Sequence, residues 1–253
     1  MIIMNLNEQL RNYLLQKGFQ IWVENIDPSD PNFAKLRAKG FGASDSAALL
    51  DVSPFTTKKQ LLQEKKYEQF DDDIPKKANV RKGKDLEPLL IQKIETIIQT
   101  KIIKPTDMYG DDRTGLSVNF DGVTLEHNQF IPHEIKVCTP YGRRYYTWTK
   151  SIMEYDYELR TFPQKDRGPA QLQSIHQLAD YYGIPIYYFT QLQQQMYFLD
   201  APYGYLDVMD DQNWCLHIFK VYRHQHVIDQ LLKEAQDAYL ILKAFRNELK
   251  EQA

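Results

Sequence analysis

The chain has 253 residues, 43% of them hydrophobic and 26% charged, which is typical of a soluble globular protein with a sizeable core. Its two cysteines, Cys138 and Cys215, exclude a disulfide framework and a four-cysteine zinc or iron–sulfur site. The formal charge of −3 gives no general attraction to nucleic acid, so any such binding needs local basic patches.

The first part of the chain is predicted to form short helices separated by turn residues. The expected helices cover residues 5–16, 45–50 and 57–67. Ser44 is well placed to cap the second of them, because a serine hydroxyl can accept a hydrogen bond from the first turn of a helix. The N-terminal part of the fold is therefore expected to be helical.

The rest of the chain is predicted to mix helices with strands. Leucines and isoleucines between Leu86 and Ile98 recur at helical spacing, and shorter apolar runs are typical of strands. The expected order is a helix over 83–99, strands over 101–104, 116–120 and 129–138, a helix over 168–182, strands over 184–190, 195–199 and 214–222, and a final helix over 224–251. This order predicts one α/β domain whose mixed central sheet is flanked by helices.

Two acids and a lysine in the middle of the chain form the most informative pattern. Asp121-Gly122 precedes Glu134-Ile135-Lys136, which lies inside an apolar run that is expected to be extended. In a strand, side chains alternate between faces, so Glu134 and Lys136 would share one face while Ile135 points into the core. A short hairpin would then place Asp121 beside Glu134.

Such an arrangement suits the cleavage of a phosphodiester with a divalent metal. Two carboxylates and the Ile135 carbonyl offer the hard oxygen ligands that Mg²⁺ prefers. Lys136 adds a compact positive charge for the attacking water or the phosphoryl oxygens. Each piece alone also has a simpler interpretation: Asp-Gly is typical of a turn, and Glu-x-Lys of a solvated salt bridge between strands.

Four blocks in chain order give this pattern a context. They are Leu36-Arg37 with Gly42-Ala43-Ser44-Asp45, then Arg81-Lys82-Gly83-Lys84-Asp85-Leu86-Glu87-Pro88, then Asn119-Phe120-Asp121-Gly122 with Glu134-Ile135-Lys136, and last Ala170-Gln171-Leu172-Gln173. Together they resemble the phage-type exonucleases of the YqaJ and lambda-exonuclease group, within the PD-(D/E)XK nuclease superfamily. Family members often carry Ser/Ala-Pro where this chain has Asn119-Phe120.

The resemblance implies a role for each residue of the nuclease centre. Asp121, Glu134 and the Ile135 carbonyl would bind the metal, and Lys136 would stabilise the transition state. Glu87 would add a carboxylate for a second ion or for a metal-bound water. Outside this context, Glu87 is also typical of a glutamate on a helix surface.

The resemblance also implies how the substrate is held. Gln171 would hydrogen-bond the attacking water or the scissile phosphate, with a polar helix surface as the simpler interpretation. Arg37 and Ser44 would form a pocket for a terminal 5′-phosphate, which suits a guanidinium and a hydroxyl at a helix start. Arg81 and Lys82 would contact the DNA backbone. The simpler interpretation is that they are solvent-exposed residues at the start of a helix.

We therefore expect a restriction-endonuclease-like nuclease domain over residues 1–253, with its core at about 33–222 and a long helix over 224–251. The resemblance implies a Mg²⁺-dependent deoxyribonuclease, with Mn²⁺ as the alternative ion. It would be a 5′→3′ exonuclease on linear double-stranded DNA, leaving 3′ single-stranded overhangs for phage-type recombination. The implied partners are double-stranded DNA ends, copies of the chain in a homotrimeric ring and a single-strand annealing protein, in the cytoplasm of a bacterial host.

Two alternatives remain open. One is an endonuclease or a Cas4-like nuclease on the same fold, although the lack of a cysteine quartet counts against the latter. The other is a catalytically silent subunit that binds DNA ends. The intact set of Asp121, Glu134 and Lys136 counts against a silent subunit, which has no need for all three.

Overall fold

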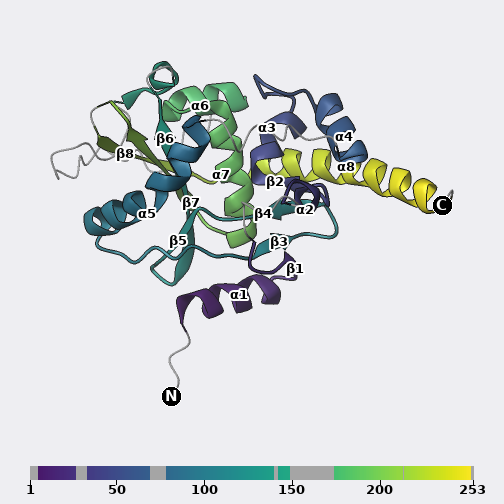
Figure 1. Cartoon of the computed structure of the whole chain (residues 1–253), viewed down its shortest axis with the longest axis horizontal. Coiled ribbons are helices and arrows are strands. Elements are labelled where there is room, and N and C mark those ends of the chain that lie inside the picture. Colours follow the sequence, from purple (N-terminus) through teal and green to yellow (C-terminus); the bar gives the residue numbers. More distant parts are fainter. Residues whose placement is uncertain are drawn as a thin grey trace. The chain divides into compact units, whose positions relative to one another are not determined.

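The computed structural model describes residues 5–26, 33–68, 78–139, 142–148, 174–212 and 214–251 (Figure 1). Residue contacts divide the chain into two compact units. The first comprises Met1–Asp71, Thr106–Asn119 and His224–Ala253, and the second comprises Asp72–Pro105 and Phe120–Arg223. Each unit contains a four-stranded sheet. The single domain expected over residues 1–253 stays a prediction.

The first unit combines a small mixed sheet with several helices. Its strands are β1 (Gln20–Val23), β2 (Phe41–Gly42), β3 (Met108–Gly110) and β4 (Leu116–Val118), in the order β1-β3-β4-β2. Strands β2 and β4 run parallel, and the other neighbours run antiparallel. Its helical segments are α1 (Leu6–Gln16), α2 (Phe33–Arg37), the 3-10 turn η1 (Ala43–Asp45), α3 (Ser46–Leu49), α4 (Lys58–Tyr67) and α8 (Gln225–Glu251).

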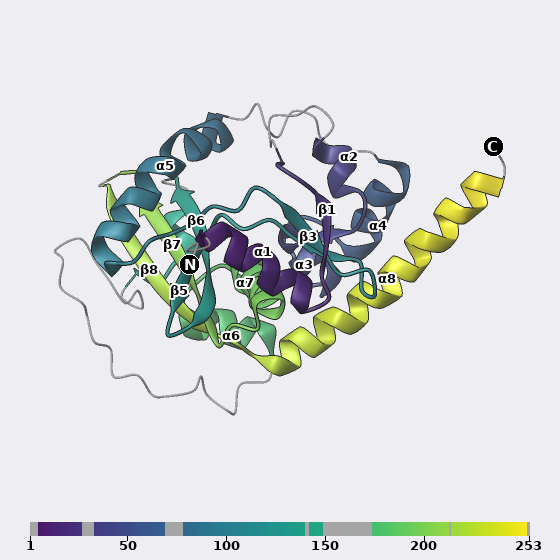
Figure 2. The ribbon, with the colours of Figure 1, turned by 90° about the horizontal axis from the view of Figure 1, so that it is seen from below.

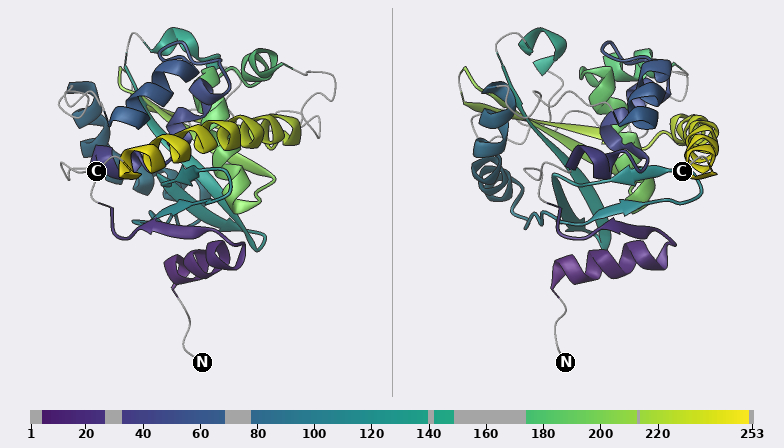
Figure 3. Two further views of the ribbon diagram at one scale, coloured as in Figure 1. Left: turned by 90° about the vertical axis from the view of Figure 1, so that its right-hand side faces the viewer. Right: turned by 45° about the vertical axis from the view of Figure 1, so that its right-hand side comes forward.

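Helix α8 confirms the long C-terminal helix, and α4 packs along it (Figure 3). Lys58 of α4 pairs with Glu234 of α8. Further along, the rings of Tyr67 and Phe245 meet edge to face, with their centroids 5.3 Å apart. The buried stripe of α8 comprises Val227, Ile228, Leu231, Ala235, Ala238, Tyr239 and Leu242. One face of this helix is thus used within its own unit.

The start of α3 differs from the prediction. Ser44 does not cap a helix, since the chain first forms η1 and α3 begins only at Ser46. The carboxylate of Asp45 accepts the Gly42 N–H at 2.9 Å and so fixes the entry to this turn. Because Asp45 supplies that contact, the Ser44 hydroxyl is used elsewhere, as an acceptor for Arg37.

The second unit is built on a larger mixed sheet. Its strands are β5 (Gly122–Glu126), β6 (Gln129–Cys138), β7 (Tyr203–Asp210) and β8 (Cys215–Tyr222), in the order β5-β6-β7-β8. Strands β6 and β7 run parallel, and the other neighbours run antiparallel. Its helical segments are α5 (Ala78–Ile98), the 3-10 turn η3 (Arg143–Tyr145), α6 (Ile175–Tyr182) and α7 (Ile186–Leu199).

Helices cover both faces of this second sheet. Ile135 of β6 packs with Leu90 and Ile94, so α5 covers its face (Figure 2). Glu134 projects to the opposite face, because side chains alternate along a strand, and there it meets Gln195 of α7. The mixed sheet between helices confirms the predicted α/β fold class.

Helix α7 corrects the prediction of two strands over residues 184–190 and 195–199. Its aromatic and branched residues suit strands, but Phe189, Leu192 and Met196 are fully buried along a helix that is covered on most sides. Such a helix shows little helical periodicity, so composition misled the prediction. The prediction also missed β1, β2, β3 and β7, and it gave β5 no bounds beyond a short hairpin with the following strand. Residues 101–104 supply only a bridge between Ile103 and Val123.

Other elements match the prediction closely. The strand over 129–138 is confirmed with the same bounds as β6, and α1, α4, α5 and β8 lie within a few residues of their expected ranges. Of the helix expected over 168–182, the described part is α6, which Ser174 caps. Among the described helices, none has the length and apolar character needed to cross a membrane.

Candidate active site

The central strand β6 presents the acid and the lysine of the sequence pattern on one face. It lies between β5 and β7, and its residues from His133 to Cys138 pair with β7. Glu134 is fully buried, and the Lys136 side chain is 27% exposed. The lysine thus reaches toward solvent from a strand whose residues are mostly buried.

Asp121 completes the cluster from the residue directly before β5. Its Oδ2 accepts the Ile135 N–H at 3.2 Å and the Lys136 Nζ at 2.8 Å. Lys136 also pairs with Oε1 of Glu134. The ammonium therefore bridges two carboxylates, and the hairpin expected from the sequence brings the three side chains together.

The electrostatics of this cluster favour a cation. Complete burial raises the pKa of Glu134 to about 7, and the nearby charge of Asp121 adds to that effect. Burial alone would lower the pKa of Lys136, but the two carboxylates outweigh it and hold this pKa well above its ordinary value. The lysine thus stays charged while its two acids compete for one counter-charge.

The donor set fits a hard divalent ion. The N–H and C=O groups of one strand residue point to the same side of the strand. Because the Ile135 N–H donates to Asp121, the Ile135 carbonyl also faces the side on which Asp121 lies. Two carboxylates and a carbonyl are oxygen ligands of the kind that Mg²⁺ or Mn²⁺ accepts. Within the described ranges, no three His, Cys, Asp or Glu side chains gather around a metal position.

Glu87 is not brought to this cluster. Its carboxylate pairs with Lys104, which follows α5 in the same unit. Its proposed part in binding a second ion stays a prediction, and the Lys104 contact would have to open for it. Gln171 lies outside the described residues.

Gln195 is a site residue that the sequence did not single out. From α7, its Nε2 donates to Oε2 of Glu134 at 2.6 Å, and both side chains are fully buried. The hydrogen bond holds the carboxylate oxygen that Lys136 does not contact. A signal was present in the run Gln191-Leu192-Gln193-Gln194-Gln195, since glutamines inside an apolar segment need partners once it is buried.

An aromatic ring and a buried hydrogen-bond network lie near the cluster. The Tyr188 ring of α7 lies 5.8 Å from Lys136 Nζ, at the limit of a cation–π contact. On the opposite face of the sheet, His133 Nδ1 lies 2.7 Å from Oδ2 of Asp207, and His133 Nε2 lies 3.2 Å from the Thr124 hydroxyl. This buried network joins β5, β6 and β7 and so helps to hold Glu134 in place.

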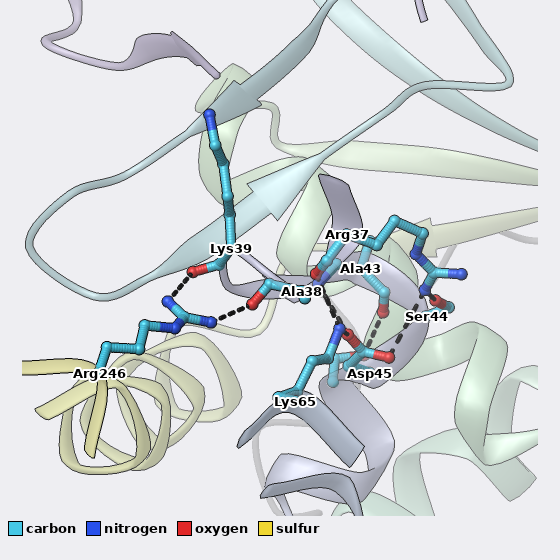
Figure 4. A network of polar contacts seen from close by, with 10 residues as sticks. Arg37, Ala38, Lys39, Ala43, Ser44, Asp45, Lys65 and Arg246 are labelled. Atoms are coloured by element: carbon cyan, nitrogen blue, oxygen red, sulfur yellow. Dashed lines mark hydrogen bonds and ion pairs between the residues drawn. The ribbon is translucent and has the colours of Figure 1, made fainter. Parts of the chain in front are cut away.

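In the first unit, the structure brings Arg37 and Ser44 together (Figure 4). Arg37 Nη2 donates to Ser44 Oγ at 2.5 Å and lies 3.6 Å from Oδ1 of Asp45. The Arg37 side chain is 37% exposed, so part of the guanidinium is accessible. An anion could use its remaining N–H groups together with the hydroxyl proton of Ser44.

The two basic residues expected to contact the DNA backbone lie in the first turns of α5. Arg81 is exposed. Lys82 Nζ lies 2.9 Å from Oδ2 of Asp211, so its charge is partly compensated. Their contact with DNA stays a prediction.

Solved structures share this fold. The crystal structure of LHK-Exo in complex with dAMP has a TM-score of 0.57 and 16% sequence identity, over 87% of this chain and 95% of that chain. A second structure of LHK-Exo, an alkaline exonuclease from Laribacter hongkongensis, gives 0.55 and 15%, over 86% and 95%. A phage-related exonuclease from Haemophilus somnus 129PT gives 0.51 and 12%, over 87% and 99%. At these identities the likeness is one of fold, and it confirms the restriction-endonuclease-like core.

The family follows from the sequence as a whole. No curated protein matches the chain. The model of one family, described as the YqaJ-like viral recombinase domain, matches residues 32–201, which include the Arg37–Ser44 pair and the whole Asp121–Glu134–Lys136 cluster. The match covers more than half of the sequence and agrees with the resemblance carried by the four blocks. The chain therefore belongs to the YqaJ-like viral recombinase family.

Proposed function

We propose that the protein is a divalent-metal-dependent exonuclease that degrades linear double-stranded DNA. The observation that carries this proposal is the cluster of Asp121, Glu134 and Lys136, with the Ile135 carbonyl on the same side. The exonucleases of similar fold support it. So does the dAMP bound by one of them, because a nucleoside monophosphate is the unit that exonucleolytic cleavage releases.

The residues of the cluster would divide the work. Asp121, Glu134 and the Ile135 carbonyl would hold the ion, which supplies Lewis acidity and a more acidic water when bound. Lys136 would place its charge against the phosphoryl oxygens, where negative charge grows in the transition state. Gln195 would keep the Glu134 carboxylate in one orientation, as a positioning residue.

The Arg37–Ser44 pair supports a preference for one kind of DNA end. A guanidinium and a hydroxyl donor suit a terminal phosphate, which carries more charge than an internal phosphodiester. If the phosphate is that of the 5′ end, digestion proceeds 5′→3′ and leaves 3′ single-stranded overhangs. Such overhangs suit a single-strand annealing partner in phage-type recombination, in the cytoplasm of a bacterial host.

The proposed function is tested on three substrates: a linear duplex with 5′-phosphates, the same duplex with 5′-hydroxyls, and a closed circle. With Mg²⁺ or Mn²⁺ we expect nucleotide release from the linear duplexes, fastest with 5′-phosphates, and none after EDTA. Cutting of the closed circle would instead indicate an endonuclease. No cleavage of any substrate, with end binding retained, would indicate a silent subunit.

We also propose that the protein forms a homotrimeric ring. A ring around the duplex would keep the enzyme on its substrate without strong positive charge, which suits a chain of net charge −3. Light scattering coupled to size exclusion should give about three times the 29.9 kDa mass of one chain. A monomer mass over a wide concentration range would contradict the ring.

A further inference from the structure

The backbone that carries Arg37 is held by basic side chains from two other helices. Arg37 is the last residue of the five-residue helix α2, whose final carbonyls lack partners within the helix. Lys65 Nζ of α4 donates to the Arg37 carbonyl at 3.0 Å. Arg246 of α8 donates to the Ala38 carbonyl at 2.5 Å and to the Lys39 carbonyl at 3.1 Å (Figure 4). Three consecutive carbonyls thus receive cationic donors.

Lys65 also contacts the carboxylate that faces the tip of Arg37. Its Nζ lies 2.7 Å from Oδ2 of Asp45, while Oδ1 of the same carboxylate lies 3.6 Å from Arg37 Nη2. The Lys65 side chain is only 3% exposed. A single buried ammonium therefore touches both the main chain of Arg37 and the only carboxylate with a described contact to its guanidinium.

The charges of this cluster leave an excess of positive charge. Burial opposes ionisation of Asp45, but Lys65 and Arg37 outweigh it and lower the pKa of this carboxyl. Burial lowers the pKa of Lys65, and the charge of Asp45 opposes that effect. With Lys65 charged, two cations share one carboxylate. With Lys65 as the close partner of Asp45, Arg37 stays at the longer distance and directs its Nη2 to Ser44. Without Lys65, Asp45 would have Arg37 as its main counter-charge and would draw the guanidinium toward itself.

A buried lysine–aspartate pair is often purely structural, and two observations separate this one from that case. Lys65 donates a hydrogen bond to the carbonyl of Arg37, and Asp45, the ion-pair partner of Lys65, faces the guanidinium of the same Arg37. In addition, Ser44 accepts its hydrogen bond from Arg37, so the serine keeps its own proton for an incoming anion. The orientation of both groups that would meet the anion thus depends on Lys65, which keeps Asp45 from drawing the guanidinium away from Ser44.

We propose that Lys65 is a positioning residue of the end-phosphate pocket, which holds Asp45 so that Arg37 and Ser44 can bind a terminal phosphate. This inference rests on the proposed function, in which Arg37 and Ser44 recognise the DNA end. Arg246 supports the same segment from α8.

The test compares kcat/KM on linear duplexes with 5′-phosphate and 5′-hydroxyl ends. Lys65→Met removes the ammonium and keeps the length of the side chain. We expect it to lower the phosphate preference by about ten-fold, the scale of one charge-assisted hydrogen bond, toward the value of Arg37→Ala. Lys59→Met, on the exposed side of the same helix, is the matched control and should keep the wild-type preference.

A second variant separates positioning from stability. In Asp45→Asn/Lys65→Met neither buried charge remains, so Arg37 is no longer neutralised and most of the preference should return. A structural pair would instead lower the thermal stability of Lys65→Met without changing the preference, which would overturn the inference. If Lys65→Met does not fold, Asp45→Asn decides: a preference at or above wild type supports the inference, and a loss overturns it.

The outcomes also distinguish the inference from the proposed function beneath it. If Arg37→Ala keeps the phosphate preference, the pocket does not lie at Arg37, and both the end recognition and the role of Lys65 fail. If Arg37→Ala loses the preference while Lys65→Met keeps it, only the role of Lys65 fails.

Discussion

Replacing Asp121, Glu134 or Lys136 is expected to lower kcat by about 10²–10³-fold or more, since each removes a charge or ligand needed in the transition state. The closest replacements in shape are Asp121→Asn, Glu134→Gln and Lys136→Met. Single-turnover cleavage of a linear duplex measures the effect. Thermal melting checks the fold, which these near-isosteric changes should preserve.

A matched control for Lys136→Met is Lys101→Met. Lys101 also forms an ion pair, with Glu95, but its side chain is 75% exposed and it lies outside the cluster. It should keep wild-type turnover. Near-normal turnover in a well-folded variant of any of the three cluster residues would refute the assignment of the active site.

In the metal-free protein, the contribution of Glu134 to the free energy of unfolding is expected to fall as the pH rises from about 4.5 to 7. In the folded protein the pKa of this carboxyl is raised to about 7 from an ordinary value of 4.5. A raised carboxyl pKa favours folding only while the group is protonated, so the contribution is complete below the ordinary pKa and is lost as the pH passes the folded one. A shift of this size corresponds to a free energy on the order of 3 kcal/mol.

Chemical unfolding in EDTA at several pH values measures this effect, with Glu134→Gln as the control that cannot ionise. The difference in the free energy of unfolding between the two proteins reports the ionisation of Glu134 together with its coupling to Asp121 and Lys136. Saturating Mg²⁺ should remove much of the wild-type loss, since it binds the ionised form. Parallel pH profiles in EDTA would contradict the prediction.

Local patterns in the sequence account for the parts that were predicted well. Strand β6 has a long apolar run, and the alternation of its side chains places Glu134 and Lys136 on one face without further information. The hairpin that brings Asp121 alongside follows from the short distance along the chain. The strands that were missed carry weaker patterns: β7 contains Asp207 and Asp210, both fully buried. Polar residues in a buried strand conceal it from a prediction based on hydrophobicity.

The remaining features depend on contacts between distant parts of the chain. Gln195 reaches Glu134 from 61 positions away, and only the correct assignment of α7 as a helix places it there. The contacts of Lys65 and Arg246 with the segment after α2 span 28 and more than 200 positions. Nothing near Arg37 in the sequence indicates these partners, because they are set by how α4 and α8 pack.

The contact between Arg246 and the Lys39 carbonyl has a consequence for how the protein is made. The two residues lie 207 positions apart, and the helix that carries Arg246 is the last described element of the chain. During translation, the Arg37 segment leaves the ribosome long before the helix that secures it. In a nascent chain the proposed end-phosphate pocket would therefore lack this support, and we expect full affinity for terminal phosphates only after α8 has emerged and docked.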